Sequence, residues 1–333
     1  DTVRVTVDAG LVDRVVYRAA DQTVIKDRIT KLGPDAPIAY LLASDLSVRE
    51  EPAFTALPAS RQGEVADVAY KYYRYLNNTA ERTPAIAEQS FALLRMQRDY
   101  DLSDDYTAPP VTPVQPDQGH RTMLLSATVG SEERDFYTDL EWRLAYHDLL
   151  DPAPGYPDGM SLNMGRFVLR AREGDALRLQ ELSLVEIRSL IPRDRFFQPW
   201  SWQVQTGLDR QWTVGSDELV PQLNGGVGVT YGAPLDGRVF ALARSRVEYN
   251  SKFDRELDIA GGAVIGFLRQ GLRHNTLLEA EQLWFTDGED RTTLKLGHNF
   301  LLKDNRALRL HVKRSVNDSV GYTEFGLGYR HYF

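Results

Sequence analysis

Residues 122–333 alternate between apolar and polar side chains with a period of two, and this alternation constrains the fold most strongly. In "DFYTDLEWRLAY" (135–146), Phe136, Leu140 and Trp142 share one face, while Asp139 and Glu141 lie on the other. A period of two predicts β-strands with one apolar face. Turn sequences such as "PLDG" and "TDGED" separate about twelve such segments. The predicted strands are 122–130, 135–146, 160–172, 176–188, 200–210, 221–232, 238–249, 257–269, 275–286, 291–302, 306–315 and 321–333.

The predicted strands favour a membrane barrel over a soluble β-sandwich, which is the alternative. Most are longer than the usual five or six residues and suit tilted strands that cross a bilayer. An even number of strands is typical of bacterial outer-membrane barrels. Trp142, Trp200, Trp202 and Trp284 fall near strand ends, as aromatic residues at membrane interfaces do. We therefore predict a mainly β fold: a twelve-stranded antiparallel outer-membrane β-barrel. Segments 160–172, 176–188 and 238–249 alternate poorly, which predicts bulges or errors of register there.

The last strand carries a further membrane signature. In "TEFGLGYRHYF" (323–333), every second residue from Phe325 to Phe333 is expected to face outward. The pattern resembles the C-terminal assembly signal of bacterial outer-membrane proteins, although His331 stands where that signal prefers an aromatic or aliphatic residue. We assign the signal to Gly328, Tyr329, His331 and Phe333 and expect the barrel-assembly machinery to be a partner. Arg330 should point into the lumen, towards Glu324 or a carboxylate of a neighbouring strand.

Residues 1–105 have helical periodicity and are predicted to form a small α-helical periplasmic region. "SRQGEVADVAYKYYRYLNN" places Val65, Val68, Ala69, Tyr72 and Leu76 on one face. Thr83 followed by Pro84 is typical of a helix start. Residues 106–121 contain several prolines, which predict an extended linker. The expected domains are 1–105, the linker 106–121 and the barrel 122–333.

Several kinds of function are disfavoured by composition. The chain has no cysteine, so disulfides, thiol nucleophiles and cysteine-based metal sites are excluded. Lys and Arg are scattered, which does not favour a nucleic-acid partner. His147, Asp148 and Ser161 have the residue types of a Ser-His-Asp triad, but with so many serines in the chain such a combination arises easily by chance. We therefore expect no catalytic residue, no cofactor and no metal in this chain.

The predicted inward faces of the strands carry charges of both signs. Burying such charges is costly unless they are paired. A selective pore would show one dominant sign, so we favour an internal ion-pair network over a selective pore. The predicted network consists of Asp139, Glu141, Arg143, Glu279, Glu281, Lys295, Arg309, His311, Lys313, Glu324 and Arg330.

Two long connections stand out because outer-membrane barrels usually have short periplasmic turns. "HDLLDPAPGYPDG" (147–159) and "LIPRDRFFQP" (190–199) fall on the same side as the helical region, which is expected to be periplasmic. They either brace the rim of the barrel or form a functional surface that docks a partner or contacts lipid. The candidate residues of that surface are His147, Asp148, Asp151, Tyr156, Arg193, Asp194, Arg195, Phe196 and Phe197.

Three stretches resemble the C-terminal part of the Lnb-type lipoprotein N-acyltransferase family of Gram-negative bacteria. They are "DTVRVTVDAGLVDRVVYR" (1–18), "EWRLAYHDLLDPAPGYPDGM" (141–160) and "SLIPRDRFFQPWSWQVQTGLDR" (189–210). The resemblance implies a papain-like periplasmic domain, a helical segment and a C-terminal barrel. The family's catalytic cysteine domain precedes the segment that resembles residues 1–18 and is absent from this chain. No catalytic residue can be carried over.

The expected function follows from this resemblance. The module would anchor a periplasmic cysteine-type acyltransferase domain at the outer membrane. The chain alone is not expected to be an enzyme. Outer-membrane lipids, the upstream catalytic domain and lipoprotein substrates would be its partners. The alternatives are an outer-membrane pore or lipid conduit, and a structural or assembly barrel without catalysis.

Overall fold

The computed structural model describes residues 2–12, 16, 18–115, 118–213, 216–251, 256–303, 305–317 and 320–333. The chain divides into two compact units. The helical unit comprises residues 1–113 and 195–197, and the barrel unit comprises residues 114–194 and 198–333.

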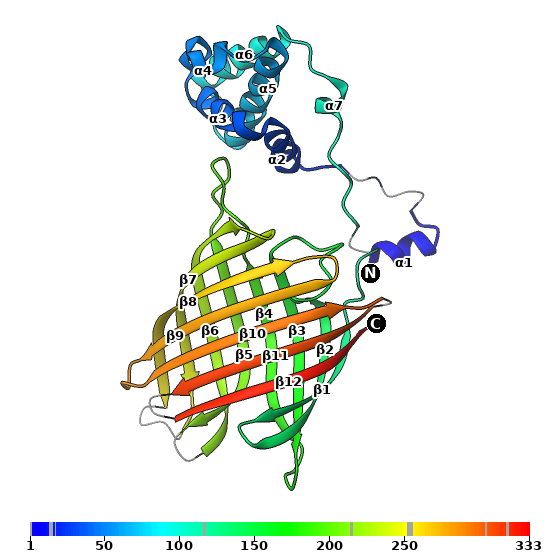
Figure 1. Ribbon diagram of the computed structural model, residues 1–333, viewed down its shortest axis with the longest axis vertical. Helices are drawn as coiled ribbons and strands as arrows, with labels where there is room; N and C mark the ends of the chain where they lie inside the picture. Colours follow the sequence, from blue (N-terminus) through cyan, green and yellow to red (C-terminus); the bar gives the residue numbers. More distant parts are fainter. Residues whose placement is uncertain are drawn as a thin grey trace. The chain divides into compact units, whose positions relative to one another are not determined.

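The barrel unit is a closed, antiparallel sheet of twelve strands, which confirms the predicted fold class. Each strand pairs with its neighbours in sequence, and β12 closes the barrel against β1 (Figure 1). The strands are β1 (Leu124–Glu132), β2 (Asp135–His147), β3 (Met160–Arg172), β4 (Arg178–Ser189), β5 (Ser201–Thr213), β6 (Ser216–Ala233), β7 (Gly237–Tyr249), β8 (Leu257–Gln270), β9 (His274–Phe285), β10 (Asp290–Leu301), β11 (Arg306–Asn317) and β12 (Val320–Tyr332).

Irregular pairing is confined to part of the region where it was predicted. The register between β3 and β4 shifts at Val168/Leu169, and that between β4 and β5 shifts between Ser183 and Val185. The predicted bulge in β7 was wrong, because β7 pairs in continuous register with both β6 and β8.

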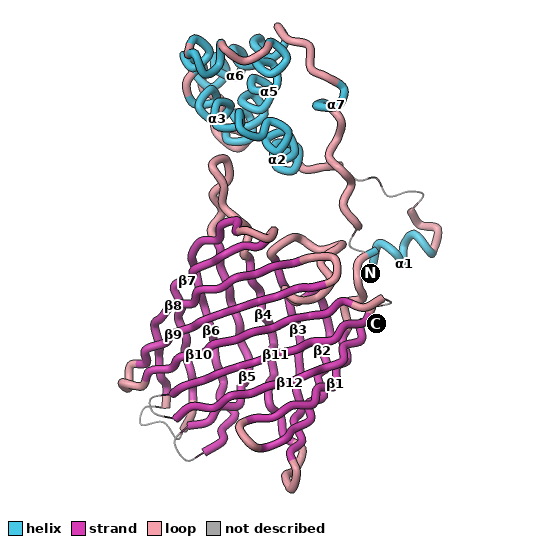
Figure 2. Tube along the Cα trace, in the orientation of Figure 1, coloured by secondary structure: helices cyan, strands magenta, loops and turns pink. Residues whose placement is uncertain are grey.

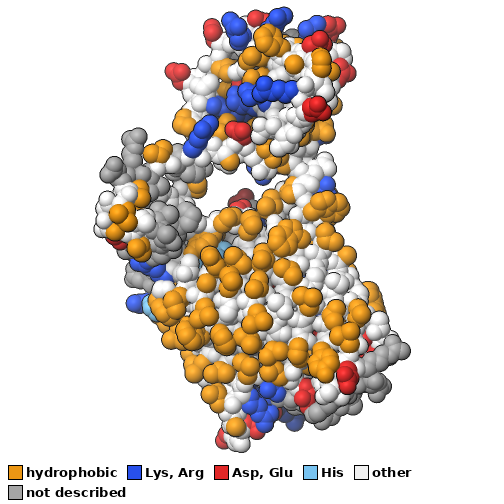
Figure 3. Space-filling model, turned by 180° about the vertical axis from the view of Figure 1, so that it is seen from behind, with side chains coloured by type: hydrophobic (Ala, Val, Ile, Leu, Met, Phe, Trp, Pro, Cys, Tyr) orange, Lys and Arg blue, Asp and Glu red, His pale blue; other side chains and the backbone are white. Residues whose placement is uncertain are grey.

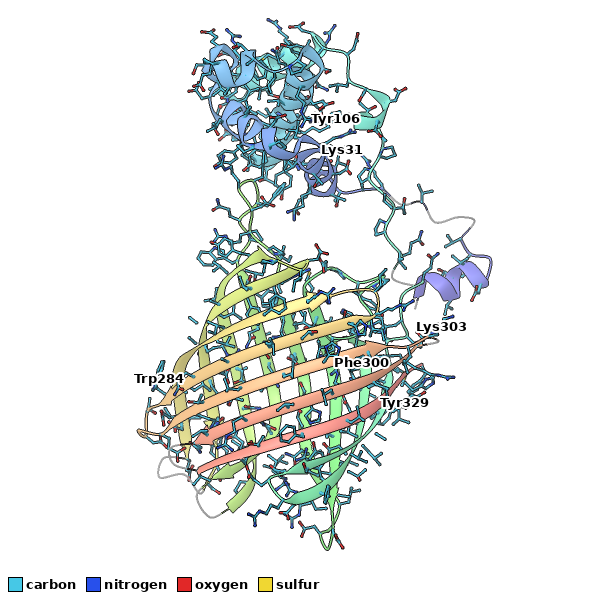
Figure 4. All side chains as sticks on the ribbon, in the orientation of Figure 1. Lys31, Tyr106, Trp284, Phe300, Lys303 and Tyr329 are labelled. Atoms are coloured by element: carbon cyan, nitrogen blue, oxygen red, sulfur yellow. The ribbon has the colours of Figure 1, made fainter. Side chains whose placement is uncertain are left out.

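The outer wall of the barrel is apolar. Hydrophobic side chains cover the wall on the face shown in Figure 3. Trp284, Phe300 and Tyr329 are 58%, 40% and 44% exposed and point away from the lumen (Figure 4). So large an exposed apolar surface is stable when lipid, rather than water, covers it.

The two ends of the barrel differ in their connections. Because the strands alternate in direction, the linker before β1, the β2–β3 and β4–β5 connections and the C-terminus all meet at one end, here called the plug end. The opposite end includes tight turns, such as Glu133–Arg134 between β1 and β2 (Figure 2). The longest connections therefore belong to the plug end.

The helical unit has its own hydrophobic core. Its helices are α1 (Thr2–Asp8), α2 (Asp21–Leu32), η1 (Gly33–Asp35), α3 (Ala36–Ser44), η2 (Leu46–Glu50), α4 (Pro52–Thr55), α5 (Ala59–Leu76), α6 (Pro84–Arg98) and α7 (Asp104–Thr107). None of the helices in the described part of the chain has the length and apolar character needed to span a membrane. Helix α6 begins as predicted, with Thr83 Oγ1 accepting from the backbone N–H of Ile86 at 3.3 Å.

The predicted face of α5 is largely buried. Val65, Val68, Ala69 and Tyr72 lie in the core, whereas Leu76 at the end of the same face is 54% exposed. Leu76 is the last residue of α5, where the apolar face extends beyond the packed core.

A contact with α7 holds the end of the helical unit's chain. Lys31 Nζ of α2 donates to the backbone oxygen of Tyr106 in α7 at 3.3 Å (Figure 4).

Phe196 and Phe197 complete this core, although they lie between β4 and β5 in the sequence. The Phe196 ring packs edge-on against Tyr72 at 5.0 Å between ring centroids, and the Tyr72 hydroxyl donates to the Phe196 carbonyl oxygen at 2.7 Å. The core is therefore built from two chain segments that are far apart in sequence.

Candidate functional site

The connection after β2, residues 148–159, turns back into the barrel instead of extending from it. Leu149, Leu150 and Asp151 are 2%, 5% and 0% exposed. Leu149 packs in a cluster with side chains from β7 and β8, including Phe240 and Leu268. We call residues 148–151 the plug segment.

Lumen-facing amides hold the backbone of the plug segment. Asn275 Nδ2 donates to the carbonyl oxygens of Leu150 at 3.1 Å and Asp151 at 2.6 Å. Asn299 Nδ2 also donates to the Leu150 oxygen, at 2.7 Å. These bonds satisfy backbone carbonyls that are buried away from the strand ladders.

Gly297 gives Leu150 the room to enter the lumen. A Cβ atom at position 297 would lie only 2.6 Å from Leu150 Cδ1, closer than carbon atoms can approach without displacement. A larger residue at position 297 would therefore push against the end of the Leu150 side chain in the plug segment.

The side chain of Asp151 is bound from several sides. Arg143 forms an ion pair with Asp151 Oδ2 at 2.6 Å, and the Tyr332 hydroxyl donates to Oδ1 at 2.6 Å. The backbone N–H of Asp148 donates to Oδ2 at 2.9 Å. Burial alone would raise the pKa of Asp151, but the guanidinium groups, Arg143 foremost, hold its pKa well below the usual range. Asp151 is therefore ionised at neutral pH.

Two histidines lie beside Asp151. His120 Nε2 is 2.8 Å from His147 Nδ1, and both residues are buried. Tyr156 stacks on both imidazole rings, with centroid distances of 4.5 Å to His120 and 4.3 Å to His147. The Tyr156 hydroxyl donates to the His120 carbonyl oxygen at 2.8 Å, so the loop and the linker before β1 are fastened together.

Below the plug segment, the lumen is crossed by ion pairs. Arg170 bonds Asp139 at 2.8 Å and Glu324 at 2.6 Å, and Arg166 bonds Glu141 at 2.8 Å. A cavity of about 360 Å³ remains between these groups. Its lining includes Asp139, Glu141, Glu279, Glu281, Lys295, Arg309, His311, Lys313, Glu324 and Arg330. The structure therefore brings these predicted lumen residues together, whereas Arg143 lies buried against Asp151.

Arg330 does not have the partner expected from the sequence. Its guanidinium bonds Glu141 of β2 at 3.0 Å, not Glu324 or a carboxylate of an adjacent strand. Ser126 of β1 is the register partner of both residues. Because its side chain is small, Arg330 reaches across β1 to the next strand.

The predicted docking loops are used differently from what was expected. His147 and Asp151 are buried, and Asp148 and Tyr156 are partly buried, so the four do not form an exposed surface. Phe196 and Phe197 are core residues of the helical unit, while Asp194 and Arg195 are exposed. The Arg193 guanidinium lies over the Trp200 ring at 5.4 Å.

Ser161, His147 and Asp148 do not form a Ser-His-Asp triad. Among the described residues, Ser161 Oγ has no hydrogen-bond partner, and His147 Nδ1 is engaged by His120. Sequence reasoning missed the roles of His120, Asn275, Gly297, Asn299 and Tyr332 in holding the plug. None stands in a local motif, and only the closure of the barrel brings them to residues 148–151.

The closed sheet, apolar wall and charged lumen define an outer-membrane type of β-barrel with a plugged end. The chain belongs to the family described as Domain of unknown function (DUF7840), which residues 113–332 match. Residues 15–109 match a second Domain of unknown function (DUF7842). No curated protein matches the chain.

Solved structures with similar barrels are distant in sequence. An outer membrane channel from Pseudomonas putida F1 is 12% identical, covering 68% of this chain and 99% of its own, with a TM-score of 0.40. KdgM porin in complex with disordered oligogalacturonate is 12% identical, covering 63% and 99%, with a TM-score of 0.34. OmpT, an outer membrane protein of Vibrio cholerae, is 9% identical, covering 63% and 96%, with a TM-score of 0.31.

Proposed function

We propose that the barrel is a gated conduit for small charged solutes and is closed in this conformation by the plug segment. The observation that carries the proposal is that a loop, rather than the barrel wall, closes the lumen above a charged cavity. Leu150 lines that cavity together with Glu141, Arg309 and Arg330. A loop can be withdrawn without breaking the strand pairing of the barrel.

The lining indicates what such a conduit would pass. Acidic and basic side chains both face the cavity, so neither cations nor anions are strongly favoured. We expect weak charge selectivity and a preference for small polar solutes. In the proposed orientation, the plug end faces the periplasm, because both chain ends of an even-stranded barrel lie there.

The closed state can be tested with a single introduced thiol, because the chain has no cysteine. In Leu150→Cys, the thiol should react with a membrane-impermeant maleimide much more slowly than in Leu177→Cys. Leu177 is 58% exposed in the β3–β4 turn, and Leu150 is 5% exposed. The measurement is the rate of maleimide labelling of each variant in reconstituted vesicles. The same rates are measured in detergent, where the reagent reaches both ends of the barrel. Equal rates in detergent would mean that the plug segment does not occupy the lumen.

An anchoring function is the second candidate. It is supported by the resemblance to the lipoprotein N-acyltransferase family and by the two-segment construction of the helical unit. Residues 195–197 give that unit a second covalent connection to the barrel chain. In this proposal, an upstream catalytic domain would be held near outer-membrane lipids and lipoprotein substrates. Membrane retention of the full-length protein after an alkaline wash should then require residues 122–333.

The second connection predicts a specific stability effect. Phe196→Ala should destabilise the helical unit by about 3–5 kcal/mol, because it removes a buried aromatic ring. Phe91→Ala is the matched control, since Phe91 is 59% exposed on α6. The measurement is thermal loss of helical circular dichroism at 222 nm, while heat-modifiable gel migration reports the barrel. Similar melting of the two variants would contradict a core role for Phe196.

A further inference from the structure

We infer that His120, His147 and Asp151 form a binding site for a divalent transition-metal ion of the Zn²⁺ type. Each residue offers one ligand atom, and these atoms lie within 4.8 Å of one another. Imidazole nitrogens and carboxylate oxygens are ligands that Zn²⁺ accepts. The inference does not rest on the proposed conduit function, because the three residues meet in the conformation described above.

The hydrogen bonds of His120 fix its ligand nitrogen. Nδ1 lies 2.6 Å from the carbonyl oxygen of Arg121, and a carbonyl oxygen can only accept. Nδ1 therefore carries the proton, and Nε2 presents its lone pair towards His147. Metal-binding histidines are commonly oriented in this way, with the second ring nitrogen bonded to a backbone carbonyl.

The surroundings keep the site in a form that can bind a metal. Tyr156 stacks on both rings and restricts their rotation. Asp151 Oδ2 is paired with Arg143 and accepts from the backbone N–H of Asp148, whereas Oδ1, which accepts from the Tyr332 hydroxyl, has a second lone pair available for a metal ion.

The two facing nitrogens are close to a metal-binding spacing. They are 2.8 Å apart, whereas two nitrogen ligands of a tetrahedral Zn²⁺ ion are about 3.3 Å apart. A small rotation of either ring opens that distance. Without a metal, the pair shares one proton, and among the described residues Nε2 of His147 has no hydrogen-bond partner.

The test is zinc binding by the purified whole chain, stripped with a chelator and titrated by calorimetry. We expect one Zn²⁺ per chain, and His120→Gln and His147→Gln should each weaken binding by about tenfold or more. The matched control is His298→Gln. His298 belongs to a second histidine pair, with His274, at a ring-centroid distance of 5.6 Å. The control should bind as the wild type does.

Heat-modifiable gel migration shows whether each variant is folded, and Co²⁺ absorption provides a second readout. A Co²⁺ spectrum typical of nitrogen and oxygen ligands, lost in both site variants, would support the inference even if zinc affinity is modest. Absence of binding by the folded wild type would overturn it. So would equal binding by the two site variants, or loss of binding only in His298→Gln.

Discussion

Replacing residues 148–158 with a short Gly-Ser linker is expected to convert the barrel from electrically silent to conducting. The replacement removes Leu150 from the lumen and the side chain of Asp151 from its bonds to Arg143 and Tyr332. It leaves all twelve strands in place. A barrel of twelve strands lies between the eight-stranded barrels filled by side chains and the sixteen-stranded porins with open channels. Removing the loop should therefore open a narrow path.

The measurement is single-channel current in planar lipid bilayers, with wild type and variant at equal protein amounts. Gly297→Leu is an independent variant, because its side chain would overlap Leu150 without shortening the loop. It should also raise the conductance. A control replacement of residues 174–177, in the turn at the opposite end, should leave the conductance unchanged. If both plug variants fold and remain silent, the ion pairs alone close the lumen and the gated-conduit proposal fails.

The second large effect concerns stability. Glu141→Gln is expected to destabilise the barrel by about 3–5 kcal/mol, because it leaves the buried Arg330 guanidinium without its ion-pair partner, whereas Arg166 keeps its pair with Glu181 at 2.6 Å. Glu141 is buried, and it bonds Arg330 at 3.0 Å and Arg166 at 2.8 Å. The substitution keeps the shape of the side chain, so the effect reports charge rather than packing.

Glu133→Gln provides the matched control for this substitution. Its carboxylate lies 3.4 Å from Arg314 in an exposed pair, where the expected loss is about 0–1 kcal/mol. Urea unfolding in lipid vesicles, followed by gel migration without heating, gives both values. If Glu141→Gln proved as mild as the control, the lumen would have to be well hydrated, and the network would contribute little to stability.

Much of the barrel could be predicted from local sequence. Strand β2 was predicted at 135–146 and is found at 135–147, because its alternation is regular and a period of two determines which face each residue occupies. The inward direction of Asp139 and Glu141 follows from the same rule. Their ion-pair partners could not be predicted, because a partner depends on barrel closure and on side-chain size, as Ser126 shows for Arg330.

The loops were the least predictable part. The composition of "HDLLDPAPGYPDG" indicated an ordered connection, and its length and its side of the barrel suggested either a brace for the barrel rim or a docking surface. The structure instead buries His147 and Asp151 in the barrel end. Nothing local distinguishes an aspartate that faces water from one that is buried against Arg143 and Tyr332. That distinction depends on residues such as Asn275 and Asn299, more than 120 positions away.

The sequence by itself determined the period, number and approximate limits of the strands, since each depends on neighbouring residues along the chain. It also determined that the lumen would hold charges of both signs. Only the tertiary structure decided that residues 148–151 occupy the lumen, that His120 meets His147, and that Phe196 joins the helical core. These contacts join segments that are far apart in sequence. They can form only after the barrel has closed and the helices have packed, because only then do the spaces that these side chains fill exist.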